Sequence, residues 1–211
     1  MIGTVLDSLL SYPYRLIVVD DYSTDQSVQI SRSKPGVDVL RHYANLGQGA
    51  SLQTGLTFIL RDPNVQWIVT FDADGQHSPE EIQNLIDPLL RDEVDVTLGS
   101  RFCRGGAGQD MPLLRRFFLK LATWLTRWST GLQVTDTHNG LRGLNRKAAE
   151  KIKIQQNRMA HASEILHQIS SHQLRYCEVP VTIRYTDYSL AKGQSLMNAV
   201  NILWDLLFGR N

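Results

Sequence analysis

Two short, continuously apolar segments that each end in acidic residues constrain the fold of this 211-residue chain most strongly. Residues 15–19 read Arg-Leu-Ile-Val-Val and stop at Asp20-Asp21, while residues 66–71 read Gln-Trp-Ile-Val-Thr-Phe and stop at Asp72. Continuous rather than alternating apolarity predicts strands covered on both faces, as in a parallel sheet. Since ligands of such sheets bind outside the carboxyl ends of the strands, the acidic residues are predicted to lie on a ligand-binding edge.

Helical and strand patterns alternate along the chain and predict an α/β fold: a mostly parallel, Rossmann-like sheet flanked by helices. Further strands are expected over 37–41, 94–98 and 176–185. Helices are expected over 2–10, 27–33, 50–60, 112–131, 146–151, 162–170 and 195–208, and one more opens near Ser78, where Glu81 would complete a capping box. Residues 1–211 are predicted to form a single domain.

Charge and cysteine content exclude several classes of protein. Twenty-two Lys and Arg residues against 21 Asp and Glu give a formal net charge of +1, which is no electrostatic footprint for nucleic acid. Cys103 and Cys177 lack nearby cysteine partners, so a zinc ribbon, a redox C-x-x-C motif and a disulfide framework are excluded. No segment reaches the roughly 18 apolar residues of a membrane span. These features favour a cytoplasmic location.

The segment Asp72-Ala-Asp74-Gly-Gln76 is the strongest candidate for a metal site. Two carboxylates two residues apart, just beyond a buried strand, can converge on one hard divalent cation, with Gln76 or water as further oxygen ligands. The alternative is a solvated acidic turn. An EF-hand is a poor match because the glycine comes at position four of the loop rather than six.

A second acidic loop, Asp20-Asp21-Tyr-Ser23-Thr-Asp25, follows the first strand. Its carboxylates and hydroxyls could accept hydrogen bonds from a base imide or from ribose hydroxyls. Alternatively, Ser23 or Asp25 caps the next helix. The ligand-binding interpretation gains support because both acidic loops fall on the same predicted edge of the sheet.

Four segments, in this order, resemble the family-two, inverting GT-A glycosyltransferases, and within them the dolichol- and polyprenol-phosphate sugar synthases. The resemblance is dense over about residues 9–104 and looser over 135–142 and 188–195. The four segments are Val-Asp20-Asp21-Tyr-Ser23-Thr-Asp25, Asn45-Leu-Gly47-Gln-Gly49-Ala-Ser-Leu-Gln-Thr-Gly55, Asp72-Ala-Asp74-Gly-Gln76-His77 and Gly99-Ser100-Arg101-Phe.

The resemblance implies a nucleotide-sugar-binding half over 1–104 and an acceptor-side half with amphipathic helices over 105–211. Asp21 would contact the nucleotide, Asp20 and Asp25 would shape its loop, and the implied donor-binding set is Asp20, Asp21, Ser23, Asp25, Asn45, Gly49 and Asp72. Asp72, Asp74 and Gln76 would hold Mg²⁺ or Mn²⁺ against the diphosphate of a UDP- or GDP-linked sugar. Arg101 and Lys192 would lie near phosphates, and the implied catalytic set is Asp74, Arg101, Asp136 and Lys192.

The acceptor stays open between two chemistries. A polyprenyl phosphate is already anionic and needs no base, whereas a hydroxyl of a growing glycan needs a carboxylate to remove its proton. Asp136 is the candidate base, and its alternative is a structural loop carboxylate. His138 is assigned a structural or acceptor-side role. A non-catalytic binding domain and a nucleotidyltransferase are the rival functions.

Two departures from the family pattern complete the expectations. The family pattern begins with a strand of the type Val-Ile-Pro-x-Tyr-Asn-Glu, which this sequence lacks. Either the chain is truncated relative to the working gene product, which we favour, or another segment takes the place of that strand. The 112–131 segment places aromatic residues beside Arg and Lys, which is typical of a helix at a membrane interface. That pattern predicts peripheral contact with the cytoplasmic face of a membrane, and the alternative is that the aromatic stripe packs on the sheet.

Overall fold

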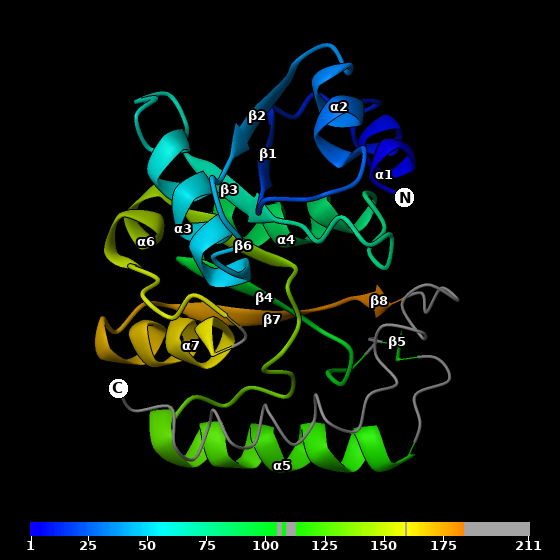
Figure 1. Ribbon diagram of the computed structural model, residues 1–211. Coiled ribbons are helices and arrows are strands. Elements are labelled where there is room, and N and C mark those ends of the chain that lie inside the picture. The colour runs from blue at the N-terminus through cyan, green and yellow to red at the C-terminus, as the bar shows by residue number, and fades with distance from the viewer. Residues whose placement is uncertain (105–106, 109–112, 159, 184–211) are drawn as a thin grey trace.

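The fold is that of a computed structural model, which describes residues 1–104, 107–108, 113–158 and 160–183. Helices and strands alternate through most of it, which confirms the predicted α/β class (Figure 1). In chain order the elements are α1 (Ile2–Leu9), β1 (Leu16–Asp20), α2 (Ser27–Arg32), β2 (Val37–Arg41), α3 (Gln48–Ile59), β3 (Trp67–Thr70), α4 (Glu81–Leu90), β4 (Val96–Ser100), β5 (Ala107–Gly108), α5 (Leu113–Thr130), β6 (Arg142–Asn145), α6 (Arg146–Lys151), α7 (His161–Ser171), β7 (Tyr176–Pro180) and β8 (Thr182–Ile183).

The strands form one four-stranded sheet and two strand pairs. The larger sheet has the order β3-β6-β4-β7, while β1 pairs with β2 and β5 pairs with β8. The pairs β1–β2 and β4–β7 are parallel, as predicted, and so is the unpredicted pair β5–β8, but β6 is antiparallel to both of its neighbours. Strand β6 was not predicted, because its sequence Arg-Gly-Leu-Asn contains a single large apolar residue.

Two further local predictions are wrong. The strand expected over 176–185 is divided into β7 and β8, and β8 leaves the large sheet to pair with β5. The capping box at α4 is absent, since this helix has no side-chain cap. The Glu81 carboxylate instead accepts a hydrogen bond from the backbone amide of Thr182, far away in the sequence. The predicted helix over 195–208 lies outside the described residues.

Apolar side chains pack on both sides of the strands. One core cluster joins α1 to β1 through residues such as Leu6 and Leu16, and another joins β4 and β6 to α6 and α7 through residues such as Val96 and Ile169. In Figure 1, β1 and β2 lie at the top of the molecule, and α5 runs along the bottom beneath α7. None of the helices in the described part of the chain combines the length and apolarity needed to cross a bilayer.

Candidate active site at the carboxyl ends of the strands

Asp21, directly after β1, binds the turn that follows β2. One carboxylate oxygen lies 2.8 Å from His42 Nδ1 and accepts the Leu46 amide at 2.8 Å, while the other accepts the Gly47 amide at 2.7 Å. Burial raises the pKa of Asp21, but the hydrogen bonds from His42, Leu46 and Gly47 outweigh that effect and hold the pKa below its ordinary value. Asp21 is therefore ionised at neutral pH and fixes this turn beside β1.

The other residues of the first acidic loop also bind the chain itself. Asp20 is buried, and its Oδ2 accepts the Ser23 amide at 3.1 Å and lies 3.3 Å from Arg41 Nε. Asp25 is exposed, and its Oδ1 accepts the amide of Ser27, the first residue of α2, at 2.9 Å. These bonds hold the loop to the start of α2 and to Arg41 of β2.

The glycine-containing turn at residues 45–49 leads into α3. Asn45 is exposed, whereas the Gly49 amide donates to the Asn157 carbonyl at 2.8 Å. A Cβ at Gly49 would lie 1.9 Å from the Gln156 carbonyl oxygen, so this approach of two backbone segments requires glycine. The backbone at 156–157 therefore covers this part of the amino terminus of α3.

Asp72, two residues beyond β3, is enclosed by three separate parts of the chain. Its Oδ1 accepts Gln48 Nε2 at 2.9 Å, and its Oδ2 lies 3.7 Å from His77 Nε2. A Cβ at Gly140 would lie 2.2 Å from the same Oδ2, so only glycine leaves room for the carboxylate. Burial raises the pKa of Asp72, but His77, Arg142 and His161 lower it by more. The pKa therefore lies below its ordinary value, and the group is ionised at neutral pH.

Asp74 and Gln76 complete the candidate metal-binding loop. Asp74 Oδ1 accepts the Gln76 backbone amide at 3.0 Å, which closes a tight turn. Among the described residues, no three His, Cys, Asp or Glu side chains are grouped closely enough to hold a metal ion. The loop thus offers two carboxylates and one amide oxygen, a hard donor set that suits Mg²⁺ or Mn²⁺ when a ligand or water supplies the remaining oxygens.

Arg101 and Asp136 form a buried, two-point ion pair. Arg101 Nε donates to Asp136 Oδ2 at 2.6 Å and Nη2 donates to Oδ1 at 2.8 Å, with only 8% and 1% of the two side chains exposed. Burial raises the pKa of Asp136, but Arg101 lowers it by more, so the carboxylate is ionised. The candidate base and the candidate phosphate-binding arginine are therefore bound to each other.

Glu178 of β7 fixes the loop that carries Asp136. Its Oε1 accepts the amides of Thr135 at 2.6 Å and of Asp136 at 3.1 Å, and its Oε2 accepts the Thr135 hydroxyl at 2.8 Å. Ser100, at the end of β4, lies 2.6 Å from the same hydroxyl. This network was not predicted, because a lone glutamate in a strand gives no signal until the sheet brings it to the loop.

Arg142 is buried, and the carboxylates of Asp72 and Asp136 both act on its charge. Burial lowers its pKa to about 10, against the opposing effect of both carboxylates, so the guanidinium keeps its charge at neutral pH. It donates to the carbonyls of Asn139 at 3.1 Å and Thr137 at 3.2 Å. Burial also lowers the pKa of His138 to about 4, so this imidazole is neutral at pH 7.

The acidic loops meet through the glycine-containing turn. Asp21 binds the amides of Leu46 and Gly47, and the next residue, Gln48, binds Asp72. On its other side Asp72 touches Gly140, which belongs to the loop that begins with Asp136. The fold thus links the predicted residues from Asp20 to Asp136, while Lys192 lies outside the described residues.

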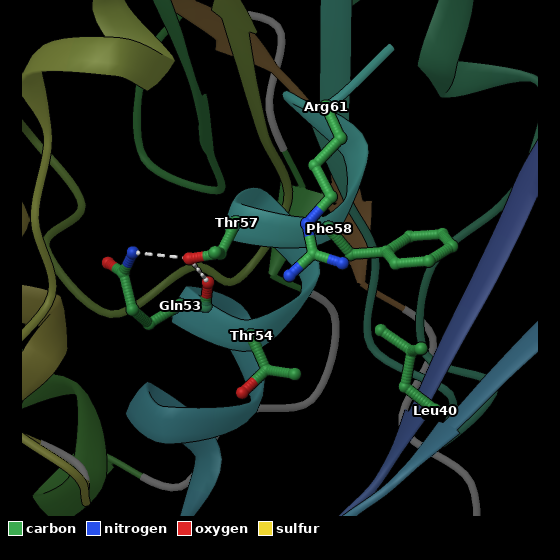
Figure 2. Close-up of a pocket in the computed structure, with 6 residues that line it drawn as sticks. All are labelled: Leu40, Gln53, Thr54, Thr57, Phe58 and Arg61. Carbon is green, nitrogen blue, oxygen red and sulfur yellow. Dashed lines mark hydrogen bonds between the residues drawn. The ribbon is translucent and has the colours of Figure 1, made fainter.

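An open hollow of about 280 Å³ lies elsewhere, beside α3 (Figure 2). Figure 2 shows its wall, formed by Leu40 of β2, by Arg61, and by Gln53, Thr54, Thr57 and Phe58 of α3. Thr54 Oγ1 lies 2.9 Å from His42 Nε2, which connects this wall to Asp21. None of the predicted site residues lines the hollow, so the candidate site is placed at the acidic loops instead.

Comparisons with known proteins give a family match and characterised relatives. A family model described as glycosyl transferase family 2 matches residues 1–153. An uncharacterized protein of Methanocaldococcus jannaschii is 36% identical over 98% of this chain and 86% of its own length. A UDP-N-acetylglucosamine–dolichyl-phosphate N-acetylglucosaminyltransferase of Methanococcus voltae is 30% identical over 98% of this chain and 90% of its own. A polyprenol monophosphomannose synthase of Mycolicibacterium smegmatis is 29% identical, over 89% and 71%.

Solved structures with the same fold include glucosyl-3-phosphoglycerate synthase from Mycobacterium tuberculosis in complex with Mn²⁺, uridine diphosphate and phosphoglyceric acid. It aligns with a TM-score of 0.69 at 16% identity, covering 97% of this chain and 73% of the synthase. A further mycobacterial protein aligns with a TM-score of 0.71 at 18% identity, over 97% and 70%. At these identities the likeness concerns the fold.

Proposed function

The chain belongs to glycosyl transferase family 2, and on that premise we propose that it moves a sugar from a nucleotide-sugar donor to a polyprenyl phosphate, with inversion at the anomeric carbon. Membership of the family and the GT-A fold make the chain a glycosyltransferase. The observation that carries the finer proposal is a series of neighbouring contacts: Asp21 binds the Gly47 amide, the next residue Gln48 binds Asp72, and Asp72 packs against Gly140. That path joins a loop suited to a nucleoside with a loop suited to a metal-bound diphosphate.

The donor would lie across this path. Asp20, Asp21, Ser23 and Asp25 form the nucleoside side, with Asn45 and Gly49 in the adjoining turn. Asp72, Asp74 and Gln76 would hold Mg²⁺ or Mn²⁺, which supplies positive charge to the departing diphosphate. The carboxylates of Asp72 and Asp74 fit such an ion because carboxylate oxygens are hard donors.

A phosphate acceptor agrees best with the state of Asp136. A general base works best when its pKa lies near the operating pH, but Arg101 holds the pKa of Asp136 below its ordinary value. A lipid phosphate oxygen is already anionic, attacks the anomeric carbon directly, and expels the nucleoside diphosphate without any proton transfer. Arg101 and Lys192 are proposed to lie near the phosphates. Transfer to a glycan hydroxyl, with Asp136 as base, is the alternative.

An exposed surface on α5, which we propose faces the membrane, supports a lipid acceptor. Lys120, Trp124 and Trp128 follow one another at four-residue spacing and so share one face of the helix, and 61% and 81% of the two tryptophans are exposed. Thr126 and Thr130 are buried on the opposite side. Exposed tryptophans beside a lysine suit the interface of an anionic bilayer. Replacing both tryptophans by alanine should abolish co-sedimentation with anionic vesicles, and unchanged co-sedimentation would count against this surface.

The decisive experiment combines binding and transfer. Thermal shifts are measured with UDP-, GDP- and dTDP-linked sugars with and without Mn²⁺, and transfer of labelled sugar to a polyprenyl phosphate is then assayed with the donor that binds. We expect metal-dependent stabilisation by one nucleotide. Asp74→Ala should lose it together with transfer, by about 100-fold or more, as when a group that stabilises transition-state charge is removed.

Glu150→Ala is the matched control, because Glu150 is an exposed carboxylate whose partner is Arg146 on the same helix. It should bind and transfer as the wild type does. If sugar is transferred to a glycan hydroxyl and not to a polyprenyl phosphate, the proposed acceptor is wrong and the alternative, with Asp136 as base, takes its place. Absence of turnover with every donor and acceptor would leave a non-catalytic binding domain.

A further inference from the structure

His77 is a buried histidine that the donor and acceptor roles above do not use. Only 8% of the residue is exposed. Its ring meets the edge of the Phe71 ring, with centroids 5.6 Å apart and planes at 63°. Nδ1 is enclosed and has no hydrogen-bond partner in the part of the chain that the structure describes. A buried polar atom left without a partner is costly, so the position of this imidazole calls for an explanation.

The other ring nitrogen faces the candidate metal-binding carboxylate. His77 Nε2 lies 3.7 Å from Asp72 Oδ2, which is beyond a hydrogen bond and within reach of one after a small movement. Asp72 Oδ1 is held from the opposite side by Gln48 at 2.9 Å. Among the described residues, the Asp72 carboxylate is the polar group that His77 Nε2 faces. Nε2 thus faces the carboxylate, where it can donate a hydrogen bond.

We propose that His77 is a positioning residue that orients the Asp72 carboxylate toward the divalent ion, an inference that rests on the proposed metal-dependent function. Gln48 Nε2 donates to one carboxylate oxygen, His77 Nε2 faces the other at 3.7 Å, and Gly140 packs against that second oxygen. A carboxylate held in this way keeps its remaining lone pairs directed at the metal. Groups that hold a ligating side chain in place typically contribute a factor of about 10–100 in metal affinity.

Three substitutions separate positioning from packing. His77→Gln places an amide nitrogen close to the position of Nε2, whereas His77→Asn places its nitrogen near Nδ1, on the side away from Asp72. Both variants lose the ring and its contact with Phe71, so each controls for the other. His77→Ala removes both features.

The readout is Mn²⁺ affinity of the full chain at saturating UDP or GDP, measured by electron paramagnetic resonance, with metal-free melting temperatures alongside. We expect His77→Ala and His77→Asn to weaken Mn²⁺ binding by about 10–100-fold. The affinity of His77→Gln should stay within about 3-fold of the wild type. His77→Gln and His77→Asn should have similar melting temperatures.

If His77→Gln and His77→Asn weaken Mn²⁺ binding equally, His77 acts through packing alone and the proposal is wrong. Wild-type affinity in all three variants would overturn it as well. Both results would leave the metal-dependent function standing, provided that the wild type binds Mn²⁺. Failure of the wild type to bind Mn²⁺ with any nucleotide would overturn both proposals.

Discussion

Strand β4 has a carboxylate–arginine pair at each end, and the two pairs differ in how they meet solvent. At its amino end, Asp95 binds Arg175, and 2% of the aspartate and 47% of the arginine side chain are exposed. At its carboxyl end, Arg101 binds Asp136, and both side chains are buried. Asp95 also accepts from Asn145 Nδ2 at 3.0 Å and from the Arg175 amide at 3.0 Å, so it joins β4, β6 and β7.

The difference in exposure suggests different roles for the two pairs. Asp95–Arg175 stabilises the sheet, whereas Arg101–Asp136 belongs to the candidate site. An arginine that stays half in water loses little solvation, so its pair can tie strands together at low cost. A pair with both partners buried loses solvation on both sides, and apolar residues of similar volume would often be as stable. We propose that the Arg101–Asp136 pair is kept for the phosphate-binding role proposed above for Arg101.

The largest expected effect comes from breaking the buried pair. Asp136→Ala leaves the Arg101 guanidinium buried without its carboxylate, which should cost about 3–5 kcal/mol of unfolding free energy. Urea denaturation of the wild type and the variant measures this difference. If the unfolding free energy falls by less than about 1 kcal/mol, burial does not distinguish the Arg101–Asp136 pair from the Asp95–Arg175 pair.

A smaller effect is expected at the amino end. Arg175→Ala leaves Asp95 with Asn145, with the amide of residue 175 and with Lys147 at 3.6 Å, while the arginine being removed is half solvated. The melting temperature should fall less than in Asp136→Ala, by about 2–4 °C. Transfer activity per folded molecule should stay at the wild-type value, and a specific loss of activity would contradict the assignment of Asp95 to structure alone.

Acid titration sharpens the comparison further. Burial raises the pKa of Asp95, but Arg175 and Asn145 lower it by more, to well below its ordinary value. Because the folded-state pKa lies below the unfolded value of about 3.9, the stabilisation is complete above that pH and declines as the pH falls below it. Asp95→Asn should therefore flatten the decline in unfolding free energy below about pH 4. An unchanged slope would show that Asp95 does not contribute to it.

The smallest effect belongs to an ion pair in open solvent. Arg91 and Glu93 lie 2.7 Å apart with 61% and 55% of their side chains exposed. Glu93→Gln should change the unfolding free energy by about 0.5 kcal/mol or less. A larger change in the same urea experiment would undermine the use of solvent exposure to rank these pairs.

Much of the fold could be predicted from the sequence because continuous apolar runs mark strands, although β3 is only partly buried and Trp67 is 44% exposed. Strands β1 and β3 are continuous apolar runs, and both lie where that pattern predicts. Strand β6 carries Arg142 and Gly143 and becomes a strand only because β3 and β4 pair with it on either side. Its pairing depends on contacts that no local pattern records.

The candidate site divides in the same way. Asp20, Asp72 and Asp74 are recognisable because acids follow apolar strands, and their roles remain predictions. His77, Glu178 and Arg142 give no comparable signal. Glu178 is one acid in a strand, and its bonds to Thr135 and Asp136 arise when β7 comes to lie beside β4. Residues that act through the placement of others need the folded structure to be found.

The antiparallel strand between β3 and β4 has a consequence for the order in which the molecule is built. Strands β3 and β4 are complete by residue 100, yet neither can form its shared hydrogen bonds until the ribosome has passed Asn145. Until then the emerging polypeptide carries two open strand edges, the kind of surface that invites misassociation. The first half of the chain therefore closes its sheet only after a segment of the second half has been made.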